Sequence, residues 1–357
     1  TFQYNLKLGI SMIQSGESLI SFVGAAESGI VPEIYEAFAA TRGLAEDKNL
    51  IKLQEQLGED YEIPNHRKIC RPFGENIGMI LGESAQFIVL MQDSLALELG
   101  LNIHGAALSS HIHSDGYKKS ISGPGAGNYL TVGKIFNEIK KHFSSDALNK
   151  TFFHAHGTST PQNRESESHI ISSISKAFGI EALPVTAIKS YLGHSLAAAG
   201  GDQMISTLGS WKNNLIPGIT STPELAKNVH KENVEFLLQN KKIEDGEFDF
   251  AVLNAKGFGG NNGTSLVASP SKTMQMLKSK YSKKDIDAYL IKKNKIDAQL
   301  DETKQEILKG DITSRYIFGE DVIDGMSDFD IQTDKITNKS NKEVFDLNST
   351  LPYKDYL

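Results

Sequence analysis

The segment that decides the fold follows an apolar run and reads His154-Ala155-His156-Gly157-Thr158-Ser159-Thr160-Pro161. A second segment, Lys189-Ser190-Tyr191-Leu192-Gly193-His194, and a third, Asn254-Ala255-Lys256-Gly257-Phe258-Gly259-Gly260-Asn261-Asn262, also follow apolar runs. Loops that end buried strands are where open α/β folds place reactive groups. Glycine beside each polar residue permits the backbone to approach a ligand closely. The sequence therefore predicts that these three loops carry the chemistry.

Around these loops, residues 1–270 alternate between segments of helical periodicity and short apolar runs. This alternation is typical of a layered α/β fold with a buried sheet. Helices are predicted at 2–13, 127–142, 164–178 and 195–211. Strands are predicted at 19–23, 87–90, 103–109, 151–155, 185–188, 248–254 and 265–268.

The composition changes after Pro270. Residues 272–309 carry ten Lys and six Asp or Glu with weak helical periodicity, and residues 310–357 carry ten acidic and five basic residues. We interpret 271–310 as a helical appendage and 311–357 as an irregular acidic tail. A solvated extension is the simpler interpretation, and an arm that binds a partner is the alternative.

The overall composition narrows the classes of function. The chain has 357 residues, a net charge of -7 and a single cysteine. The negative charge argues against nucleic acid as the main partner, because phosphate binding draws on Lys and Arg. A single cysteine fits a reducing compartment, so we expect a cytoplasmic protein. No run of about 18 apolar residues predicts a membrane span.

Histidine, lysine and threonine on such loops can polarise a carbonyl and hold protons near neutral pH. The pairs His154/His156 and His111/His113 also permit a zinc site, but no cysteine pair or acidic ligand stands at supporting spacing. None of the three loops matches a glycine-rich nucleotide motif. We therefore expect no metal and no cofactor.

Five motifs taken together resemble the β-ketoacyl-acyl-carrier-protein synthase family of condensing enzymes. The three loops resemble its H-G-T-[GS]-T-P, K-[SA]-x-x-G-H and N-[SA]-F-G-F-G-G-x-N signatures, in that order. Arg71-Pro72-Phe73 with Gly82-Glu83 resembles R-P-F-D...G-E-G, and Gly24-Ala25-Ala26-Glu27 resembles G-G-x-E. The resemblance covers residues 1 to about 268.

The resemblance implies a thiolase-like αβαβα fold of two similar halves. Residues 1–115 would be the end of the first half and 116–270 the whole second half. It also implies a homodimer or heterodimer that acts on acyl carrier protein with acyl and malonyl phosphopantetheine thioesters. The implied reaction is a decarboxylative Claisen condensation in fatty acid or polyketide biosynthesis, which is acyltransferase chemistry.

The site residues follow from the same resemblance. His156 and His194 would stabilise the enolate, and Lys189 would sustain the charge balance around them. Phe258 would gate the pocket and contribute a backbone N–H to the oxyanion hole. Pantetheine would be held by Thr158 and Thr160, and the site supported by Glu167 and Asn254.

The nucleophile needs a cysteine at a helix N-terminus, where the helix dipole raises the thiolate fraction. Cys70 does not fit, because Pro72 and Gly74 follow it, and we expect it to be a structural thiol. Aligning the family helix on Asn5 puts the cysteine two positions before Thr1. We therefore expect the chain to begin within the fold and to be inactive alone.

Two departures from the family pattern stand out: Arg164 replaces an Asp, and Lys256 replaces the first Phe of the third signature. They indicate a divergent subfamily. The alternative function is a non-condensing partner subunit of the chain-length-factor type, which would carry glutamine in place of the upstream cysteine. Two further alternatives are a scaffold role for residues 272–357 and a metal hydrolase using the paired histidines.

Overall fold

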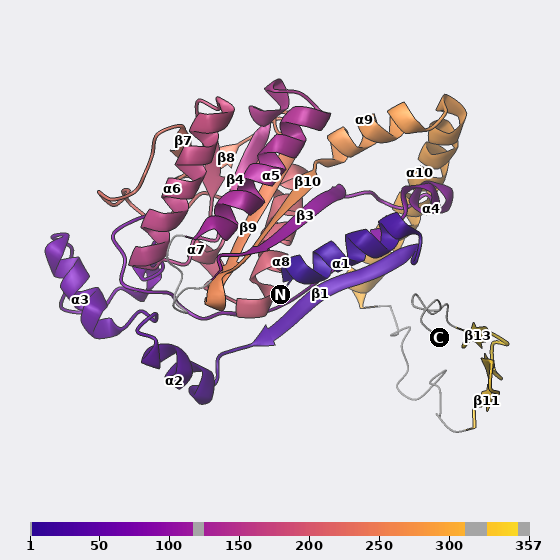
Figure 1. Cartoon of the computed structure of the whole chain (residues 1–357), viewed down its shortest axis with the longest axis horizontal. Helices are drawn as coiled ribbons and strands as arrows, with labels where there is room; N and C mark the ends of the chain where they lie inside the picture. The colour runs from indigo at the N-terminus through magenta and orange to yellow at the C-terminus, as the bar shows by residue number, and fades with distance from the viewer. Residues whose placement is uncertain (1, 117–124, 311–326, 349–357) are drawn as a thin grey trace. The chain divides into compact units, whose positions relative to one another are not determined.

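Short runs without polar interruptions form the centre of the main sheet in the computed structural model, which describes residues 2–116, 125–310 and 327–348 (Figure 1). Every residue of β4 (Thr151–His154) and β5 (Leu183–Thr186) is buried. β9 (Phe250–Gly257) lies beside β4 and β7 (Val234–Phe236) beside β5, all parallel. Strands buried on both faces read as continuous apolar runs, which explains why the sequence predicted three of these four.

The same sheet continues with antiparallel strands. β10 (Asn261–Ala268) pairs with β9, and β3 (Ala106–Ser114) pairs with β10, giving the order β3-β10-β9-β4-β5-β7. The third glycine-rich segment, predicted as a loop over residues 254–262, comprises the end of β9, the tight turn Phe258–Gly260 and the first two residues of β10. The α/β class predicted from the sequence is confirmed.

Helices cover both faces of this sheet (Figure 1). α5 (Ala126–His142) and α6 (Pro161–Phe178) pack on one face, where Phe153 and Val252 lie in their apolar cluster. α1 (Phe2–Ser15) and α8 (Ala199–Asn213) pack on the other face. There Phe152 and Leu253 join Phe2, Leu6 and Met204 in a second cluster. Neighbouring side chains of one strand thus pack into the helix layers on opposite faces of the sheet, as the two-residue period of a strand requires.

A two-stranded antiparallel ribbon of β1 (Ile20–Ser28) and β2 (Glu83–Met91) packs against α1 and α8. One face of the ribbon contributes the buried Val23 to the second cluster, whereas Phe22 and Phe87 on the other face are exposed.

The remaining elements of residues 2–268 are α2 (Pro32–Ala40), α3 (Asp47–Gln56), α4 (Asp93–Leu99), α7 (Lys189–Leu192), β6 (Leu215–Ile216), β8 (Lys241–Lys242) and the 3-10 turns His66–Lys68, Asp146–Leu148, Leu196–Ala198 and Phe258–Gly260.

The chain divides into two units, Thr1–Asp297 and Ala298–Leu357. α9 (Pro270–Lys280) and the first part of α10 (Lys283–Lys309) belong to the first unit, where Tyr289 donates a hydrogen bond to the carbonyl of Leu101 at 3.0 Å. The division between the units falls inside α10, which ends at Lys309. The boundary at residue 310 that we inferred from the sequence stays a prediction.

The second unit contains a three-stranded antiparallel sheet of β11 (Phe329–Ile331), β12 (Lys335–Asn338) and β13 (Val344–Asp346). The prediction of an irregular tail at 311–357 is wrong for this stretch; residues 311–326 and 349–357 lie outside the described ranges. Ile336 pairs with both Ile331 and Phe345. Strands of three or four residues are too short to show a two-residue period, so the pattern escaped detection.

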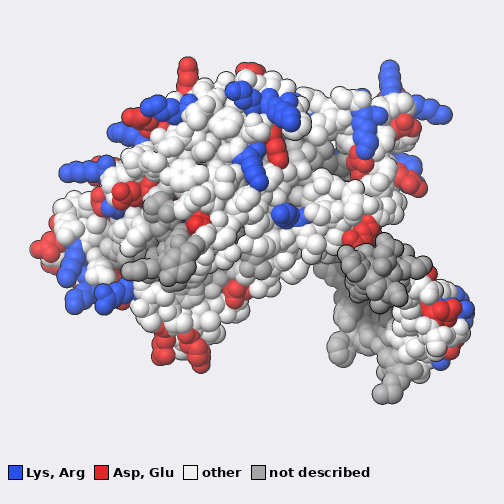
Figure 2. All heavy atoms as spheres, in the orientation of Figure 1, with Lys and Arg blue, Asp and Glu red and all other residues white. Residues whose placement is uncertain are grey.

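Basic and acidic side chains are interspersed over the face seen in Figure 2. Within the described residues, no helix combines the length and the apolar character that crossing a bilayer requires.

Candidate active site

The three predicted loops meet at one edge of the main sheet. β4, β5 and β9 are parallel neighbours, so their carboxyl ends lie at the same edge. The loop after β4 carries His156, the segment after β5 carries Lys189 and His194, and the turn after β9 carries Phe258. This is the edge at which open α/β sheets bind ligands.

A cavity of about 390 Å³ opens at this edge, and both His156 and His194 line it. The two imidazole ring centroids are 5.3 Å apart and the rings are nearly perpendicular, at 85°. Phe2 and Gln3, at the start of α1, line the same cavity. The structure thus brings the two predicted histidines together beside the first turn of α1.

Backbone amides fix the tautomer of both rings. The N–H of Lys256 donates to Nδ1 of His156 at 3.2 Å, and the N–H of Leu196 donates to Nδ1 of His194 at 3.1 Å. A backbone amide can only donate, so each Nδ1 is an acceptor and each neutral ring carries its proton on Nε2. The site therefore holds two imidazoles that each have one N–H available to a ligand.

Burial, and then the positive charge of Lys189, hold the pKa of His156 and His194 well below the usual value. Lys189 is 2% exposed, and burial lowers the pKa of its ammonium to about 8, against the attraction of Glu167, Asp202 and Cys70. Within the described residues, its Nζ has no hydrogen-bond partner. Lys189 therefore acts on the imidazoles through its charge, which adds to the effect of burial in keeping them neutral.

Glu167 holds the loop that carries His156. The carboxylate is fully buried and accepts hydrogen bonds from the backbone N–H groups of His156 (2.7 Å) and Gly157 (2.9 Å). The side-chain amides of Asn163 (2.9 Å) and Asn254 (2.8 Å) donate to the same carboxylate. Glu167 and Asn254 thus shape the loop from behind and do not line the cavity.

Thr158, Thr160 and Phe258 line the cavity around the imidazole pair. The two hydroxyls are 3.2 Å apart, and that of Thr160 also caps α6. The Phe258 side chain is 47% exposed and packs on Phe38 of α2, with 5.5 Å between the ring centroids. Gly259 follows it at a φ of 75°, a conformation that favours glycine.

The environment of the single cysteine, Cys70, does not favour a nucleophilic role. The Cys70 thiol donates to the carbonyl of Lys189 at 3.0 Å, and burial raises its pKa to about 12. A thiol that stays protonated at neutral pH is a poor nucleophile. This geometry agrees with the structural role that the sequence indicated.

Arg164 and Lys256, the two residues that depart from the family pattern, have different surroundings. The Arg164 guanidinium turns away from the cavity and contacts Glu75 at 2.9 Å and the carbonyl of Gly74 at 2.9 Å. The Lys256 side chain is buried, and its Nζ donates to the Ser166 hydroxyl at 3.3 Å. Arg164 does not line the cavity, whereas Lys256 does, and its positive charge helps to lower the pKa of His156.

The other histidines that the sequence offered as metal ligands, His154, His111 and His113, form hydrogen bonds outside the candidate site. His154 accepts a hydrogen bond from the N–H of Ile188 at 3.1 Å, and burial lowers its pKa to about 3. His111 bonds to Glu138 and His113 to Lys134. Within residues 2–116, 125–310 and 327–348, His, Cys, Asp and Glu form no group of three suited to a metal.

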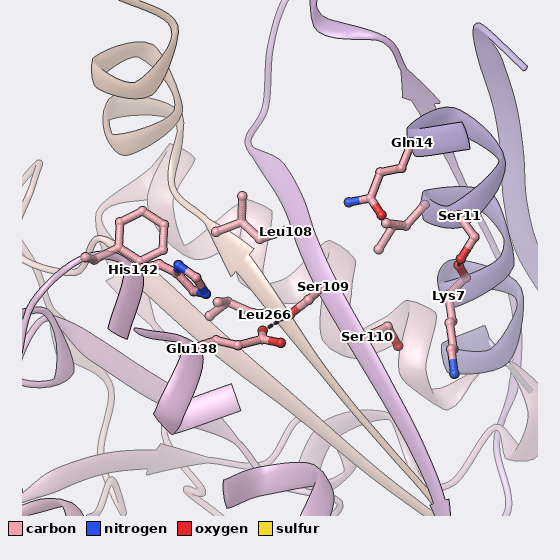
Figure 3. Close-up of a pocket in the computed structure, with 11 residues that line it drawn as sticks. Lys7, Ser11, Gln14, Leu108, Ser109, Ser110, Glu138, His142 and Leu266 are labelled. Carbon is pink, nitrogen blue, oxygen red and sulfur yellow. Dashed lines mark hydrogen bonds between the residues drawn. The ribbon is translucent and has the colours of Figure 1, made fainter. Parts of the chain in front are cut away.

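A second cavity, of about 430 Å³, lies between α1, β3 and α5 (Figure 3). Its carboxylate, Glu138, accepts from the Ser109 hydroxyl at 2.5 Å and contacts Nε2 of His111 at 2.6 Å. None of the residues predicted for the site lines it. We therefore place the candidate active site in the first cavity.

Sequence reasoning missed two buried residues of α8. The Gln203 amide donates to the carbonyls of Ala155 (2.8 Å) and Asn254 (2.9 Å), which joins two of the three loops. Asp202 accepts from the Ser195 hydroxyl, beside His194. The available signal was a polar pair directly after the small residues Ala199-Gly200-Gly201, which let a helix approach its neighbours.

Comparisons with known proteins agree with this geometry. Residues 105–222 match the model of the β-ketoacyl synthase C-terminal domain. The chain is 42% identical over 325 residues to the β-ketoacyl-[acyl-carrier-protein] synthase FabY of Pseudomonas aeruginosa, covering 91% of this chain and 50% of that protein. It is 25% identical over 259 residues to 3-oxoacyl-[acyl-carrier-protein] synthase 2 of Staphylococcus aureus, covering 70% of this chain and 56% of that one.

Solved structures give the same result. The crystal structure of the noncanonical ketosynthase FabY from P. aeruginosa superimposes with a TM-score of 0.89 at 39% identity, over 100% of this chain and 55% of that chain. A type II polyketide ketosynthase in complex with its acyl-carrier protein shares the fold, with a TM-score of 0.62 at 19% identity, over 75% of this chain and 60% of that one. The chain spans about half the length of these relatives. It belongs to the β-ketoacyl-[acyl-carrier-protein] synthase family and has that family's thiolase-like fold.

Proposed function

We propose that this protein is a β-ketoacyl-[acyl-carrier-protein] synthase that condenses an acyl thioester with malonyl thioester, in fatty acid or polyketide biosynthesis. One observation carries the proposal. His156 and His194 line one cavity, each with its Nδ1 occupied by a backbone N–H and its proton on Nε2, and both feel the charge of the buried Lys189 ammonium. Two fixed donors next to each other suit a single developing oxyanion.

The first step is loss of CO2 from malonyl thioester. The C–C bond to the carboxylate breaks, and its electron pair moves onto the thioester oxygen to give an enolate. The Nε2–H groups of His156 and His194 donate to that oxygen, and one such donor is typically worth about 3 kcal/mol. Burial, together with the Lys189 charge, keeps both rings neutral, so the donors neither titrate nor transfer a proton at neutral pH.

The second step joins the two carbon chains. The enolate carbon attacks the carbonyl of an acyl group held on cysteine, and the thiolate leaves to give a 3-oxoacyl product. We propose that this cysteine stands two residues before Thr1, outside the described residues. Support comes from Phe2 and Gln3, which begin α1 and line the cavity with the imidazoles. The backbone N–H of Phe258 is proposed to complete the oxyanion hole.

Both substrates are proposed to arrive on the phosphopantetheine arm of acyl carrier protein, with Thr158 and Thr160 contacting the arm. Both hydroxyls line the cavity. The Pseudomonas relative is named a β-ketoacyl-[acyl-carrier-protein] synthase, and that name includes the carrier protein. A dimeric assembly and a cytoplasmic location remain part of the proposal.

Replacement of His194 by Ala tests the proposal in the complete protein. We expect His194→Ala to lower the rate of malonyl-carrier-protein decarboxylation by about 10²-fold or more, because it removes one enolate donor. CO2 release and acetyl-carrier-protein formation are the measurements. His169→Ala, which changes an exposed histidine, is the matched control. Wild-type decarboxylation by His194→Ala would overturn the proposal.

The residue two before Thr1 separates a synthase from a partner subunit: cysteine favours the first and glutamine the second. The complete coding sequence supplies this observation directly.

A further inference from the structure

A buried carboxylate lies beside the proposed catalytic centre without a part in the steps above. Asp202 is 4% exposed and stands in the first turn of α8. It accepts hydrogen bonds from the Ser84 hydroxyl at 2.6 Å, the Gln86 amide at 3.1 Å and the Ser195 hydroxyl. Surroundings made only of donors suit a carboxylate, which can only accept. A first helical turn also favours negative charge.

These hydrogen bonds connect three parts of the fold. Ser84 and Gln86 lie on β2, whereas Ser195 directly follows His194. The backbone of His194 is also bonded to this region, because the N–H of Gly82 donates to its carbonyl at 3.0 Å. Asp202 thus ties the segment that presents His194 to both α8 and the start of β2.

Asp202 also acts on the Lys189 ammonium. Several elements bring charged or titratable groups near Lys189. These groups are Glu167 from α6, Asp202 from α8, Cys70 from the segment after the 3-10 turn His66–Lys68, and the imidazoles of His154, His156 and His194. Only Glu167 and Asp202 bring carboxylates. Both attract the ammonium and oppose the burial that lowers its pKa to about 8.

Glu167 already has a structural task, because both of its oxygens accept hydrogen bonds from the loop that carries His156 and from Asn254. Arg164 stands where the resembled family has an Asp, and its guanidinium contacts Glu75 instead. Position 164 therefore carries a positive charge in place of the negative one that the family motif has. Asp202 supplies a negative charge from α8.

We propose that Asp202 is a positioning residue of the catalytic centre: its negative charge balances the buried Lys189 ammonium, and its hydrogen bonds hold the His194 segment against β2. The inference rests on the proposed function, because the roles of Lys189 and His194 come from it. Asp202 reaches the substrate only through these two residues.

The first test is the pH profile of malonyl decarboxylation by the complete protein. The Asp202→Asn variant keeps the size of the side chain and removes its charge. In both proteins the rate should decline on the alkaline side, and we expect this decline to occur about one pH unit lower in the variant than in the wild type. The reason is that losing a nearby opposite charge lowers the pKa of an ammonium by about 1–3 units. Loss of a hydrogen bond alone would not move this limb.

Ser84→Ala is the matched control, since it removes one hydrogen bond to Asp202 and leaves the carboxylate in place. We expect its alkaline limb to coincide with that of the wild type. The proposal is overturned if Asp202→Asn leaves the limb unmoved, or if Ser84→Ala moves it equally far.

The second test measures stability and needs no activity, so it separates failure of this inference from failure of the proposed function. Asp202→Asn should lower the midpoint of thermal unfolding, because Lys189 then keeps a poorly balanced buried charge. Adding Lys189→Met removes that charge and should restore part of the loss. A double variant whose loss equals the sum of the two single losses would contradict the charge coupling. If Asp202→Asn alone fails to fold, a folded double variant supports the proposal and an unfolded one overturns it.

Discussion

Replacing Glu167 by Gln should damage both stability and catalysis, and the structure sets the magnitude. The carboxylate accepts four hydrogen bonds, from the N–H groups of His156 and Gly157 and from the amides of Asn163 and Asn254. A glutamine oxygen at Oε1 keeps the bonds from His156 and Asn254. Its NH2 group then faces the other two donors. Two bonds to a charged acceptor are lost at about 1.5–3 kcal/mol each, which predicts a loss of about 3–6 kcal/mol.

The catalytic effect has a different cause. The Gly157 N–H loses its acceptor, so the loop that carries His156 is no longer fixed. A displacement of about 1 Å in a positioned group can lower a rate by about 10²-fold. We therefore expect Glu167→Gln to lower malonyl decarboxylation by that order even in molecules that remain folded.

The assay pairs thermal unfolding, followed by circular dichroism, with decarboxylation measured well below the unfolding midpoint. The control is Glu165→Gln on the same helix, because Glu165 is exposed and its carboxylate accepts a single described hydrogen bond, from the Asn228 amide at 3.1 Å. Surface changes of this kind alter the free energy of unfolding by about 0.5 kcal/mol or less. The reasoning is refuted if Glu167→Gln unfolds at the temperature of Glu165→Gln and retains its rate.

Three further predictions concern the cavity and the buried groups near it. Phe258→Ala should change acyl transfer more than stability, because its ring is 47% exposed; single-turnover acylation beside thermal unfolding measures this, and a large loss of stability alone would contradict it. The decarboxylation rate should be flat from mildly acidic pH to about pH 7, since the imidazoles stay neutral. It should fall as pH rises through about 8, because Lys189 then loses the positive charge that helps to stabilise the negative enolate; a decline centred near pH 6.5 on the acid side would show a titrating imidazole instead. Iodoacetamide should leave Cys70 unmodified in the native protein and label it after unfolding, because burial raises its pKa to about 12; peptide mass spectrometry detects the adduct, and rapid native labelling would refute the structural role.

The sequence was sufficient to place the three loops because their relation is topological. Parallel neighbouring strands end at one edge of a sheet, so loops after Thr151–His154, Leu183–Thr186 and Phe250–Gly257 must converge. Apolar runs of four to eight residues identify such strands without any knowledge of the partners. The imidazole pair followed from this convergence together with the family signatures.

The Asp202 network could not be predicted in the same way. Its partners Ser84 and Gln86 are 118 and 116 residues away in the sequence, and the contact depends on how α8 packs against β2. A buried aspartate on a helix has no periodic or local signature that distinguishes it from an exposed one. The short strands β6, β7 and β8 escaped for a related reason, because two or three residues carry no measurable period.

The arrangement of backbone donors also decides what kind of catalyst the imidazoles are. Protonating His156 or His194 would place a proton on Nδ1, where the N–H of Lys256 or Leu196 already points at it. Such a donor–donor contact opposes the imidazolium form independently of the Lys189 charge. A group that is prevented from accepting a proton is a poor general base but a constant hydrogen-bond donor. The pair is therefore suited to hold an enolate oxygen, and proton transfer would require the end of β9 and the turn after α7 to give up these two backbone contacts.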